Sequence, residues 1–306
     1  MEGPRVGFIG LGLMGGSMSR VLLSKGFPVR GYDLDPKKVA AVVELGGKGA
    51  DSPAEVASSV DILCTSLPNG AILKDVCLGS GDALAQLAPG SVLVDFSTTE
   101  PEAIRELHAA AIQRGIEVVD APVSGGPAEI PAGKLVVLVG CSDEAFRRAE
   151  PVLTALAGGG LHRIGKVGDA RVVKLVNNVI AMGNVLIAAE GFTLGVKAGV
   201  DPKTLFDVLS NSGARSNHLN KRFPWALQRD FAPRFSMNNA IKDLRLGLVL
   251  GQEVGSPMPA ASVIQQLFSA AAAQGHGEED AVAVLRLFEA WAGVEADARD
   301  AGREGV

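Results

Sequence analysis

The chain has 306 residues, of which 47% are apolar and 21% are charged, a balance that supplies a packed core and excludes an intrinsically disordered protein. Its net charge of −5 argues against a nucleic-acid-binding protein, which usually carries a positive field. At roughly 100–200 residues per domain, the length allows two domains.

Strand-like and helix-like segments alternate in the first half of the sequence. The candidate strands are rich in valine and isoleucine and lack strict polar alternation, as is typical of strands buried on both faces. Helices are predicted to begin at Asp35-Pro36, at Ser52-Pro53 and near Pro101. The alternation predicts an α/β fold with a Rossmann-type, doubly wound parallel sheet. The candidate strands are Arg5–Ile9, Val29–Tyr32, Val60–Ser66, Ser91–Phe96, Ile116–Ala121 and Lys134–Val139.

After about residue 163 the pattern becomes helical. Gly168–Ala198 is apolar on nearly every face, which predicts one long helix between domains or subunits. Polar residues within it would be costly in a bilayer, so we expect no membrane span. We therefore predict an α/β domain, residues 1–165, and an all-α domain, residues 166–306. Later helices are predicted from Asp201, about Asn238, Pro257 or Pro259, and Glu278 or Glu279.

A glycine-rich motif, Gly10-Leu11-Gly12-Leu13-Met14-Gly15, joins the first predicted strand to the first helix. In such a G-x-G-x-x-G motif the first glycine makes a tight turn, the second admits a pyrophosphate, and the third lets the helix pack closely. Asp33 ends the second strand, where a carboxylate pairs with the adenosine ribose and repels a 2′-phosphate. This combination favours NAD binding over a glycine turn beside an unrelated surface aspartate.

Three other places carry polar groups that could serve a substrate. Ser124, Gly125 and Gly126 offer a hydroxyl and two N–H groups to an anion, although alone they are better explained as an ordinary turn. Lys174 and Asn178 share one face of the long helix. The residues leave open whether Lys174 is buried for proton transfer or reaches solvent from the helix end. Lys242 and Asp243, taken alone, indicate a solvated ion pair.

Together and in this order, the motifs resemble the β-hydroxyacid dehydrogenase family, which includes 3-hydroxyisobutyrate dehydrogenase and several semialdehyde reductases. The resemblance runs from about Arg5 to about Asp280 and implies a Rossmann domain joined by a long interdomain helix to an all-α domain. It rests on Gly-Phe-Ile-Gly-Leu-Gly-Leu-Met-Gly (7–15), Ser-Leu-Pro-Asn (66–69), Asp-Phe-Ser-Thr (95–98), Asp-Ala-Pro-Val-Ser-Gly-Gly (120–126), Gly165 to Gly168, Lys-Leu-Val-Asn-Asn (174–178) and Lys-Asp-Leu (242–244).

The resemblance implies a role for each motif. Lys174 is the catalytic acid/base, Asn178 helps orient the substrate, and Ser124, Gly125 and Gly126 hold the substrate carboxylate. The segment after this turn, Pro-Ala-Glu-Ile-Pro-Ala-Gly-Lys (127–134), departs from the smaller, less proline-rich stretch of many members. The cofactor is held by the residues of the glycine motif, Asp33, Leu67, Pro68 and Thr98, with Lys242 at its nicotinamide end.

The expected reaction is reversible hydride transfer between NAD and the terminal carbinol of a small β-hydroxy acid, giving the semialdehyde. The alternatives are a semialdehyde reductase, acting on tartronate or succinic semialdehyde with NADH or NADPH, and a non-catalytic dinucleotide-binding scaffold. Cys64, Cys77 and Cys141 are far apart without a C-x-x-C pair, which favours a reduced, cytoplasmic protein without a zinc site. We also expect a homo-oligomer, a dimer or tetramer, with no nucleic-acid or membrane partner.

Overall fold

The computed structural model describes residues 3–299. It separates into two compact units, the first ending at Lys174 and the second beginning at Leu175. The division falls within the long helix α8 (Asp169–Lys197), later than the predicted boundary at residue 165, because the first residues of α8 are bonded to the first unit.

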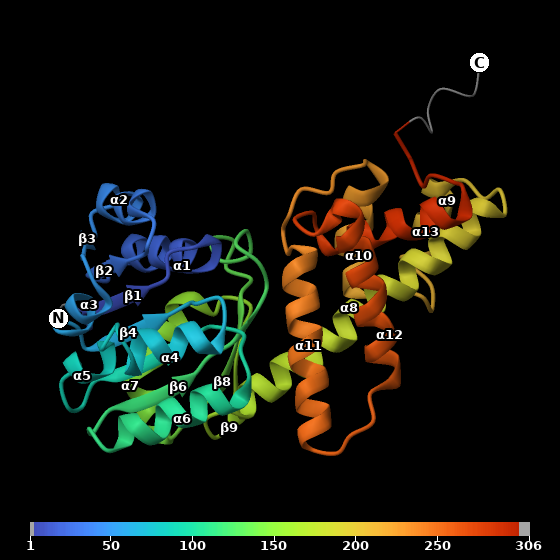
Figure 1. The fold of residues 1–306 in the computed structure, drawn as a ribbon. Coiled ribbons are helices and arrows are strands. Elements are labelled where there is room, and N and C mark those ends of the chain that lie inside the picture. Colours follow the sequence, from blue (N-terminus) through green and yellow to red (C-terminus); the bar gives the residue numbers. More distant parts are fainter. Residues whose placement is uncertain (1–2, 300–306) are drawn as a thin grey trace. The chain divides into compact units, whose positions relative to one another are not determined.

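The first unit contains a nine-stranded sheet with helices on both faces (Figure 1). Six strands are parallel, in the order β3 (Lys48–Gly49), β2 (Val29–Tyr32), β1 (Val6–Ile9), β4 (Ile62–Thr65), β5 (Val92–Asp95) and β6 (Glu117–Asp120). At the β6 edge, β8 (Val136–Gly140) runs antiparallel to β6 and pairs with β7 (Val123–Ser124) and β9 (Gly160–Gly165). The predicted fold class is confirmed, but an all-parallel sheet is wrong at this edge, because no helix crosses over between β6 and β8.

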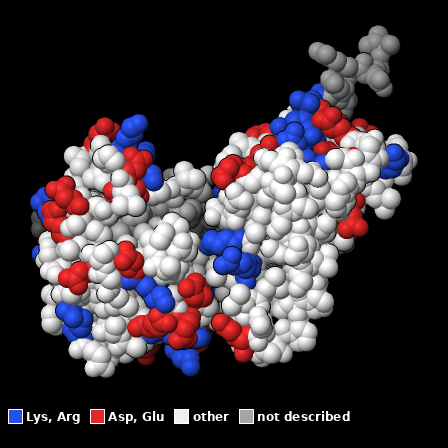
Figure 2. All heavy atoms as spheres, in the orientation of Figure 1, with Lys and Arg blue, Asp and Glu red and all other residues white. Residues whose placement is uncertain are grey.

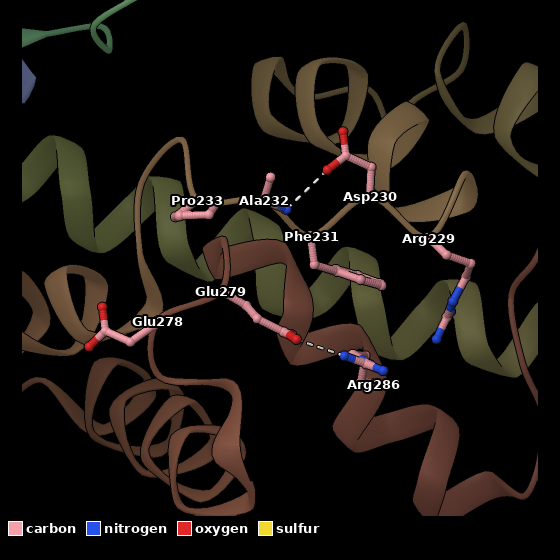
Figure 3. A pocket seen from close by; sticks show the side chains of 8 residues that line it. All are labelled: Arg229, Asp230, Phe231, Ala232, Pro233, Glu278, Glu279 and Arg286. Atoms are coloured by element: carbon pink, nitrogen blue, oxygen red, sulfur yellow. Dashed lines mark hydrogen bonds and ion pairs between the residues drawn. The ribbon is translucent and has the colours of Figure 1, made fainter.

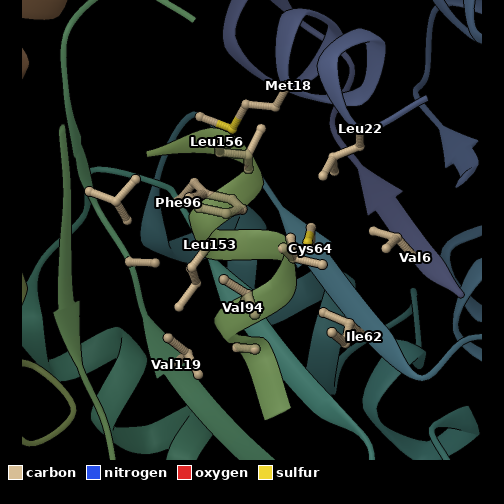
Figure 4. Close-up of a cluster of buried hydrophobic side chains, with 14 of the residues drawn as sticks. Val6, Met18, Leu22, Ile62, Cys64, Val94, Phe96, Val119, Leu153 and Leu156 are labelled. Carbon is tan, nitrogen blue, oxygen red and sulfur yellow. The ribbon is translucent and has the colours of Figure 1, made fainter. Parts of the chain in front are cut away.

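Alternating strand residues supply two separate cores. Phe8 packs with Met18 and Leu22 on the face covered by α1 (Leu13–Ser24), α2 (Pro36–Glu44) and α7 (Asp143–Leu156), as Figure 4 shows for part of this core. The neighbouring residue Ile9 packs with Leu73 on the other face, under α3 (Pro53–Ala57), α4 (Gly70–Leu78), α5 (Ala83–Gln86) and α6 (Pro101–Ile112). Both faces are therefore buried, which explains the valine- and isoleucine-rich strands.

The predicted helix starts agree with the local hydrogen bonds. The side chain of Asp35 accepts from the Lys37 N–H at the start of α2, and Ser52 Oγ accepts from the Glu55 N–H at the start of α3. Each of these helices has proline in its first turn, where no N–H donor is needed. Capping residues thus set where α2 and α3 begin.

The regular elements of the second unit are all helices within its described residues, 175–299. Its core includes Phe192, whose ring centroid lies 5.4 Å from that of Phe223, together with Leu244 and Phe268. Helix α10 is not predicted from the sequence, because Pro224 lies within it. The helices after α8 are α9 (Pro202–Leu209), α10 (Asn217–Leu227), α11 (Met237–Glu253), α12 (Pro259–Ala271) and α13 (Val284–Ala292), with a π turn at Ala272–His276 and a 3₁₀ turn at Ala281–Ala283.

Helix α8 is apolar but is not buried on every side. Val176, Ile180, Ile187 and Leu194 are between 51% and 71% exposed, and their spacing of four and then seven residues places them on one face. By length and composition α8 could cross a bilayer, but the core helix of a soluble protein meets the same criterion. We call these four residues the α8 stripe.

The three cysteines are buried free thiols. Burial raises the pKa of the Cys64 and Cys77 thiols far above the ordinary range and that of Cys141 to about 11. Within residues 3–299, no three or more His, Cys, Asp or Glu side chains are grouped so that they could hold a metal ion.

Candidate active site

The glycine motif forms the turn between β1 and α1. Gly10 has a φ of +88°, a left-handed conformation, and a Cβ there would clash with the Ser66 carbonyl oxygen. A Cβ on Gly15 would clash with the Gly10 carbonyl oxygen, so glycine is what lets α1 approach the turn. Gly12 precedes α1 and has open space within 4 Å of where its Cβ would stand. The turn thus offers the N-terminus of α1 to an anion such as a pyrophosphate.

Asp33 directly follows β2 and is tied to this turn. Its Oδ2 accepts a hydrogen bond from the Leu11 N–H at 2.8 Å, and its Oδ1 accepts one from the Asp35 N–H at 2.9 Å. Lys38 Nζ lies 3.3 Å from Oδ1. A carboxylate is therefore fixed beside the glycine turn, as binding of a ribose diol would require.

The other predicted cofactor and substrate residues of the first unit lie at the same edge of the sheet. Leu67 and Pro68 follow β4, and Thr98 follows β5; Ser124 is the last residue of β7, four positions after the end of β6, and Gly125 and Gly126 follow it. Because β4, β5 and β6 are parallel to β1 and β2, their carboxyl ends meet where ligands of such sheets bind. Ser17 Oγ of α1 donates to the Pro127 carbonyl oxygen at 3.1 Å, which links the helix after the glycine turn to the segment after Gly126.

A buried ionic cluster lies beneath this edge. We call Asp95, Asp120 and Arg171 the sheet-edge cluster; all three side chains are 0–1% exposed. Arg171 Nε donates to Asp120 Oδ1 at 2.9 Å, and the guanidinium also bonds to Asp95 and to Thr99. Asp120 Oδ2 accepts from the N–H groups of Gly168 (3.1 Å) and Arg171 (3.2 Å). Burial raises the pKa of Asp120, and the positive charge of Arg171 acts against that rise.

The sheet-edge cluster connects the start of α8 to the predicted cofactor loops. Ser97 Oγ donates to Asp95 at 2.6 Å and accepts from the Leu67 N–H at 2.8 Å. Arg171 lies in the first turn of α8, and Lys174 lies three residues further along the same helix. The helix that carries Lys174 is therefore anchored to the ends of β5 and β6. Arg171 could not be assigned this role from the sequence, because the only local signal is its position three residues before Lys174.

The second unit holds a different polar group, which we call the helix cluster: Asn177, Asn178, Lys242 and Asp243. Asn178 Nδ2 donates to Asp243 Oδ2 at 2.5 Å, and Asn178 Oδ1 accepts from Asn177 Nδ2 at 2.9 Å. Lys242 Nζ lies 2.9 Å from Asp243 Oδ1. Asp243 is only 2% exposed, so the prediction of a solvated Lys242–Asp243 pair is wrong: packing in α11 buries the carboxylate. The structure thus joins Asn178 and Lys242 through Asp243, a residue given no role from the sequence.

A cavity of about 500 Å³ lies elsewhere in the second unit (Figure 3). Phe231 sits there with Arg229 and Arg286, whose guanidinium carbons are each 5.0 Å from its ring centroid. Arg229 pairs with Glu289 and Arg286 pairs with Glu279, so both charges serve the fold. The residues lining this cavity include none of the predicted site residues.

Surface charge gives no sign of a nucleic-acid site on the face shown in Figure 2, where basic and acidic side chains are interspersed.

Of the known families, two models match the chain. Residues 5–176 match the NAD binding domain of 6-phosphogluconate dehydrogenase, and residues 168–288 match the NAD-binding domain of NADP-dependent 3-hydroxyisobutyrate dehydrogenase. The chain belongs to the β-hydroxyacid dehydrogenase family.

Individual relatives align over nearly the whole chain. It is 38% identical to 2-(hydroxymethyl)glutarate dehydrogenase of Eubacterium barkeri, across 95% of this chain and 96% of that protein. It is 36% identical to 3-hydroxyisobutyrate dehydrogenase of Pseudomonas aeruginosa, across 86% and 91%. A structure of Mycobacterium tuberculosis 3-hydroxyisobutyrate dehydrogenase with L-serine superposes with a TM-score of 0.86 at 31% identity, covering 93% and 99% of the chains.

These likenesses confirm the predicted family and activity. The chain is an NAD-dependent β-hydroxyacid dehydrogenase, an oxidoreductase whose substrate is a hydroxy acid. The alternative of a non-catalytic scaffold is therefore set aside. The roles predicted for individual residues remain predictions.

Proposed function

We propose that the chain oxidises the terminal hydroxyl of a small β-hydroxy acid of the 3-hydroxyisobutyrate type, with Lys174 as the acid/base. One observation carries this proposal. The sheet-edge cluster anchors the first turn of α8 at the edge where the glycine turn, Asp33 and the Ser124–Gly126 turn also lie. The relatives named for hydroxy acids add support for the substrate class.

The residues divide the chemical work. NAD, when bound along the glycine turn, supplies the acceptor for the hydride. Lys174 takes the hydroxyl proton during oxidation and returns one to the carbonyl oxygen in the reverse direction. Asn178, with its amide fixed by Asp243 and Asn177, orients the same oxygen. Ser124 and the N–H groups of Gly125 and Gly126 hold the substrate carboxylate.

The decisive experiment replaces Lys174. In Lys174→Ala we expect kcat to fall by roughly 10²–10⁴-fold, the usual contribution of general acid–base catalysis. NAD affinity, measured by calorimetry, should stay nearly unchanged, because the glycine turn and Asp33 lie on other elements. Lys174→Arg should also fail, since guanidinium does not release its proton near neutral pH.

Lys197 provides a matched control, because it is an exposed lysine at the other end of α8. Lys197→Ala should keep wild-type kcat. A panel of 3-hydroxy acids with NAD, and of tartronate and succinic semialdehydes with NADH and NADPH, identifies the substrate and the favoured direction. If folded Lys174→Ala keeps more than about a tenth of wild-type kcat, the residue is structural and the proposed mechanism is wrong.

We further propose that the chain works in the cytoplasm as a homo-oligomer, a dimer or tetramer, with no membrane or nucleic-acid partner. The α8 stripe supports self-association, because four large aliphatic side chains aligned on one helix face favour burial against a second copy. Light scattering of wild type and of Ile187→Lys tests this proposal. A wild-type monomer at micromolar concentration would contradict it.

A further inference from the structure

The carboxylate of Glu129 lies in the turn to which the substrate carboxylate is assigned. The Gly126 N–H donates to Glu129 Oε2 at 2.8 Å. This N–H is one of the three donors that the proposed function gives to the substrate. Glu129 belongs to the segment 127–134, which directly follows that turn. A side chain of this protein therefore meets the donor that its substrate is expected to use.

The backbone around Glu129 holds its side chain close to this donor. The Glu129 N–H donates to the Gly126 carbonyl oxygen at 3.1 Å, and the Glu129 carbonyl oxygen accepts from the Lys134 N–H at 2.8 Å. The next residue, Ile130, is 2% exposed and belongs to the core under the sheet. A Cβ on Gly125 would stand only 3.4 Å from Glu129 Cβ. Little conformational freedom is therefore lost when the carboxylate bonds to Gly126.

The Glu129 carboxylate and a substrate carboxylate compete for the Gly126 N–H through two effects. A carboxylate on a backbone N–H makes a charge-assisted hydrogen bond, which is stronger than a neutral one. A substrate that uses the Gly126 N–H must displace Glu129, and its own negative charge then lies beside a second one. Because the Glu129 side chain is partly exposed, it can turn toward water when displaced. The contact therefore weakens substrate binding without blocking it, and it leaves the reacting carbon untouched.

We propose that Glu129 is a specificity-determining residue, an internal carboxylate that competes with the substrate carboxylate for the Gly126 amide. The proposal rests on the proposed role of the Ser124–Gly126 turn. Competition acts on any substrate or inhibitor that brings a carboxylate to this turn. It predicts that wild type binds such compounds more weakly than a variant in which residue 129 carries no charge.

The test compares Glu129→Gln and Glu129→Ala with wild type. Glutamine keeps the length of the side chain and can still accept from the Gly126 N–H, but it lacks the charge. The probes are 3-hydroxyisobutyrate as substrate and isobutyrate, which lacks the reacting hydroxyl, as a ligand measured by calorimetry. Glu129→Ala should lower both KM and the isobutyrate dissociation constant by about three- to thirtyfold, with kcat within about twofold of wild type. This change in affinity is smaller than the change on the order of 10- to 100-fold expected for a complete charge-assisted hydrogen bond. The reason is that the displaced Glu129 side chain forms hydrogen bonds with water instead.

Glu117→Gln is the matched control. Glu117 begins β6, at the opposite edge of the sheet from the turn, and its carboxylate accepts from Ser142 Oγ at 2.9 Å. This variant removes the same charge and should leave KM and isobutyrate affinity unchanged. An equal fall of KM in Glu117→Gln and Glu129→Gln would reduce the effect to net charge and overturn the competition.

Ser124→Ala separates the inference from the function on which it rests. If Ser124→Ala raises KM while both Glu129 variants leave KM unchanged or raise it, the turn binds substrate and the competition is wrong. If wild type neither oxidises a hydroxy acid nor binds isobutyrate, the proposed function fails and the inference fails with it. A fall of KM in Glu129→Gln alongside a rise in Ser124→Ala supports both.

Discussion

The sheet-edge cluster and the helix cluster accommodate charge in opposite ways. In the first, one guanidinium and two carboxylates are wholly buried and bonded to one another and to the main chain. In the second, the buried carboxylate of Asp243 meets an amide and a lysine that is 32% exposed. A buried guanidinium must keep its hydrogen bonds to the protein, because it cannot exchange them for bonds to water. A partly exposed lysine can exchange its carboxylate partner for water. The first cluster is thus suited to anchor a helix, and the second holds a lysine whose position is less tightly fixed.

The largest expected effect comes from removing the buried cation. Arg171→Met leaves two buried carboxylates without their partner, which should lower the free energy of unfolding by about 3–5 kcal/mol. Lys242→Met removes a cation that is 32% exposed, and the buried Asp243 keeps its bond from Asn178, so this variant should lower it by less, about 1–2 kcal/mol. Urea titrations followed by circular dichroism measure both values. Equal losses in the two variants would refute the difference drawn between the clusters.

Asp120→Asn sharpens the same comparison. The sheet-edge cluster has one more carboxylate than cations, and burial already raises the pKa of Asp120. Neutralising this residue therefore removes a penalised charge, and its one amide oxygen can still accept from the Gly168 and Arg171 backbone N–H groups, but the Arg171 Nε–H loses its acceptor. We expect a smaller loss of stability than in Arg171→Met, measured by the same urea titration.

A side chain outside both clusters should control cofactor choice. We expect wild type to prefer NAD to NADP by at least about tenfold in kcat/KM, or about 1.4 kcal/mol, because Asp33 repels a 2′-phosphate. Asp33→Asn can still accept from the Leu11 N–H, so it isolates the charge, whereas Asp33→Ser also shortens the side chain. Both variants should show a smaller preference for NAD over NADP in steady-state assays with the two cofactors. Equal use of NAD and NADP by wild type would remove this role from Asp33.

Asp243→Asn tests whether the helix cluster orients Asn178. Asparagine keeps the shape of the side chain but loses the charge that accepts from Asn178 Nδ2 and pairs with Lys242. We expect kcat to fall by about three- to tenfold, in line with one weakened hydrogen bond of about 1 kcal/mol, and KM to change less. Steady-state kinetics on folded protein measure the split. A variant that loses stability but keeps wild-type kcat would make Asp243 purely structural.

The smallest expected effect is a pH dependence of the stability of the first unit. Burial lowers the pKa of half-buried His108 in α6, with Glu117 acting weakly in the opposite sense. Between this lowered pKa and the ordinary value of about 6.5, the unfolded chain binds more protons than the folded one. Stability contributed by neutral His108 is therefore present above about pH 6.5 and declines as the pH falls. Unfolding at pH 7.5 and 5.5 should show a smaller acid loss in His108→Gln than in wild type.

Local patterns predicted most of the fold. Runs of valine and isoleucine located the central strands, and Asp35-Pro36 and Ser52-Pro53 located helix starts, because these are properties of adjacent residues. The strand β9 could not be predicted because none of the residues Gly160–Gly165 is buried and the strand carries His and Arg rather than an apolar run.

The candidate site was predictable only where a motif is contiguous. The glycine turn and Asp33 follow from neighbouring residues and strand order. The bond between Arg171 and Asp95 joins residues 76 positions apart, and that between Asn178 and Asp243 joins residues 65 apart. No local pattern encodes such partners, since they meet only after β5, β6 and α8, or α8 and α11, have packed. The contact of Glu129 with Gly126 was likewise not predictable, because it forms only in the folded turn.

The three buried cysteines make the native chain a convenient background for chemical labelling. Thiolate is the form that attacks maleimides and disulfides, and burial raises the pKa of Cys141 to about 11 and those of Cys64 and Cys77 further. At neutral pH these sulfurs are protonated and shielded from reagents. Leu34→Cys, at an exposed position beside Asp33, would therefore react first, and a fluorophore attached there would report cofactor binding without removal of any native cysteine.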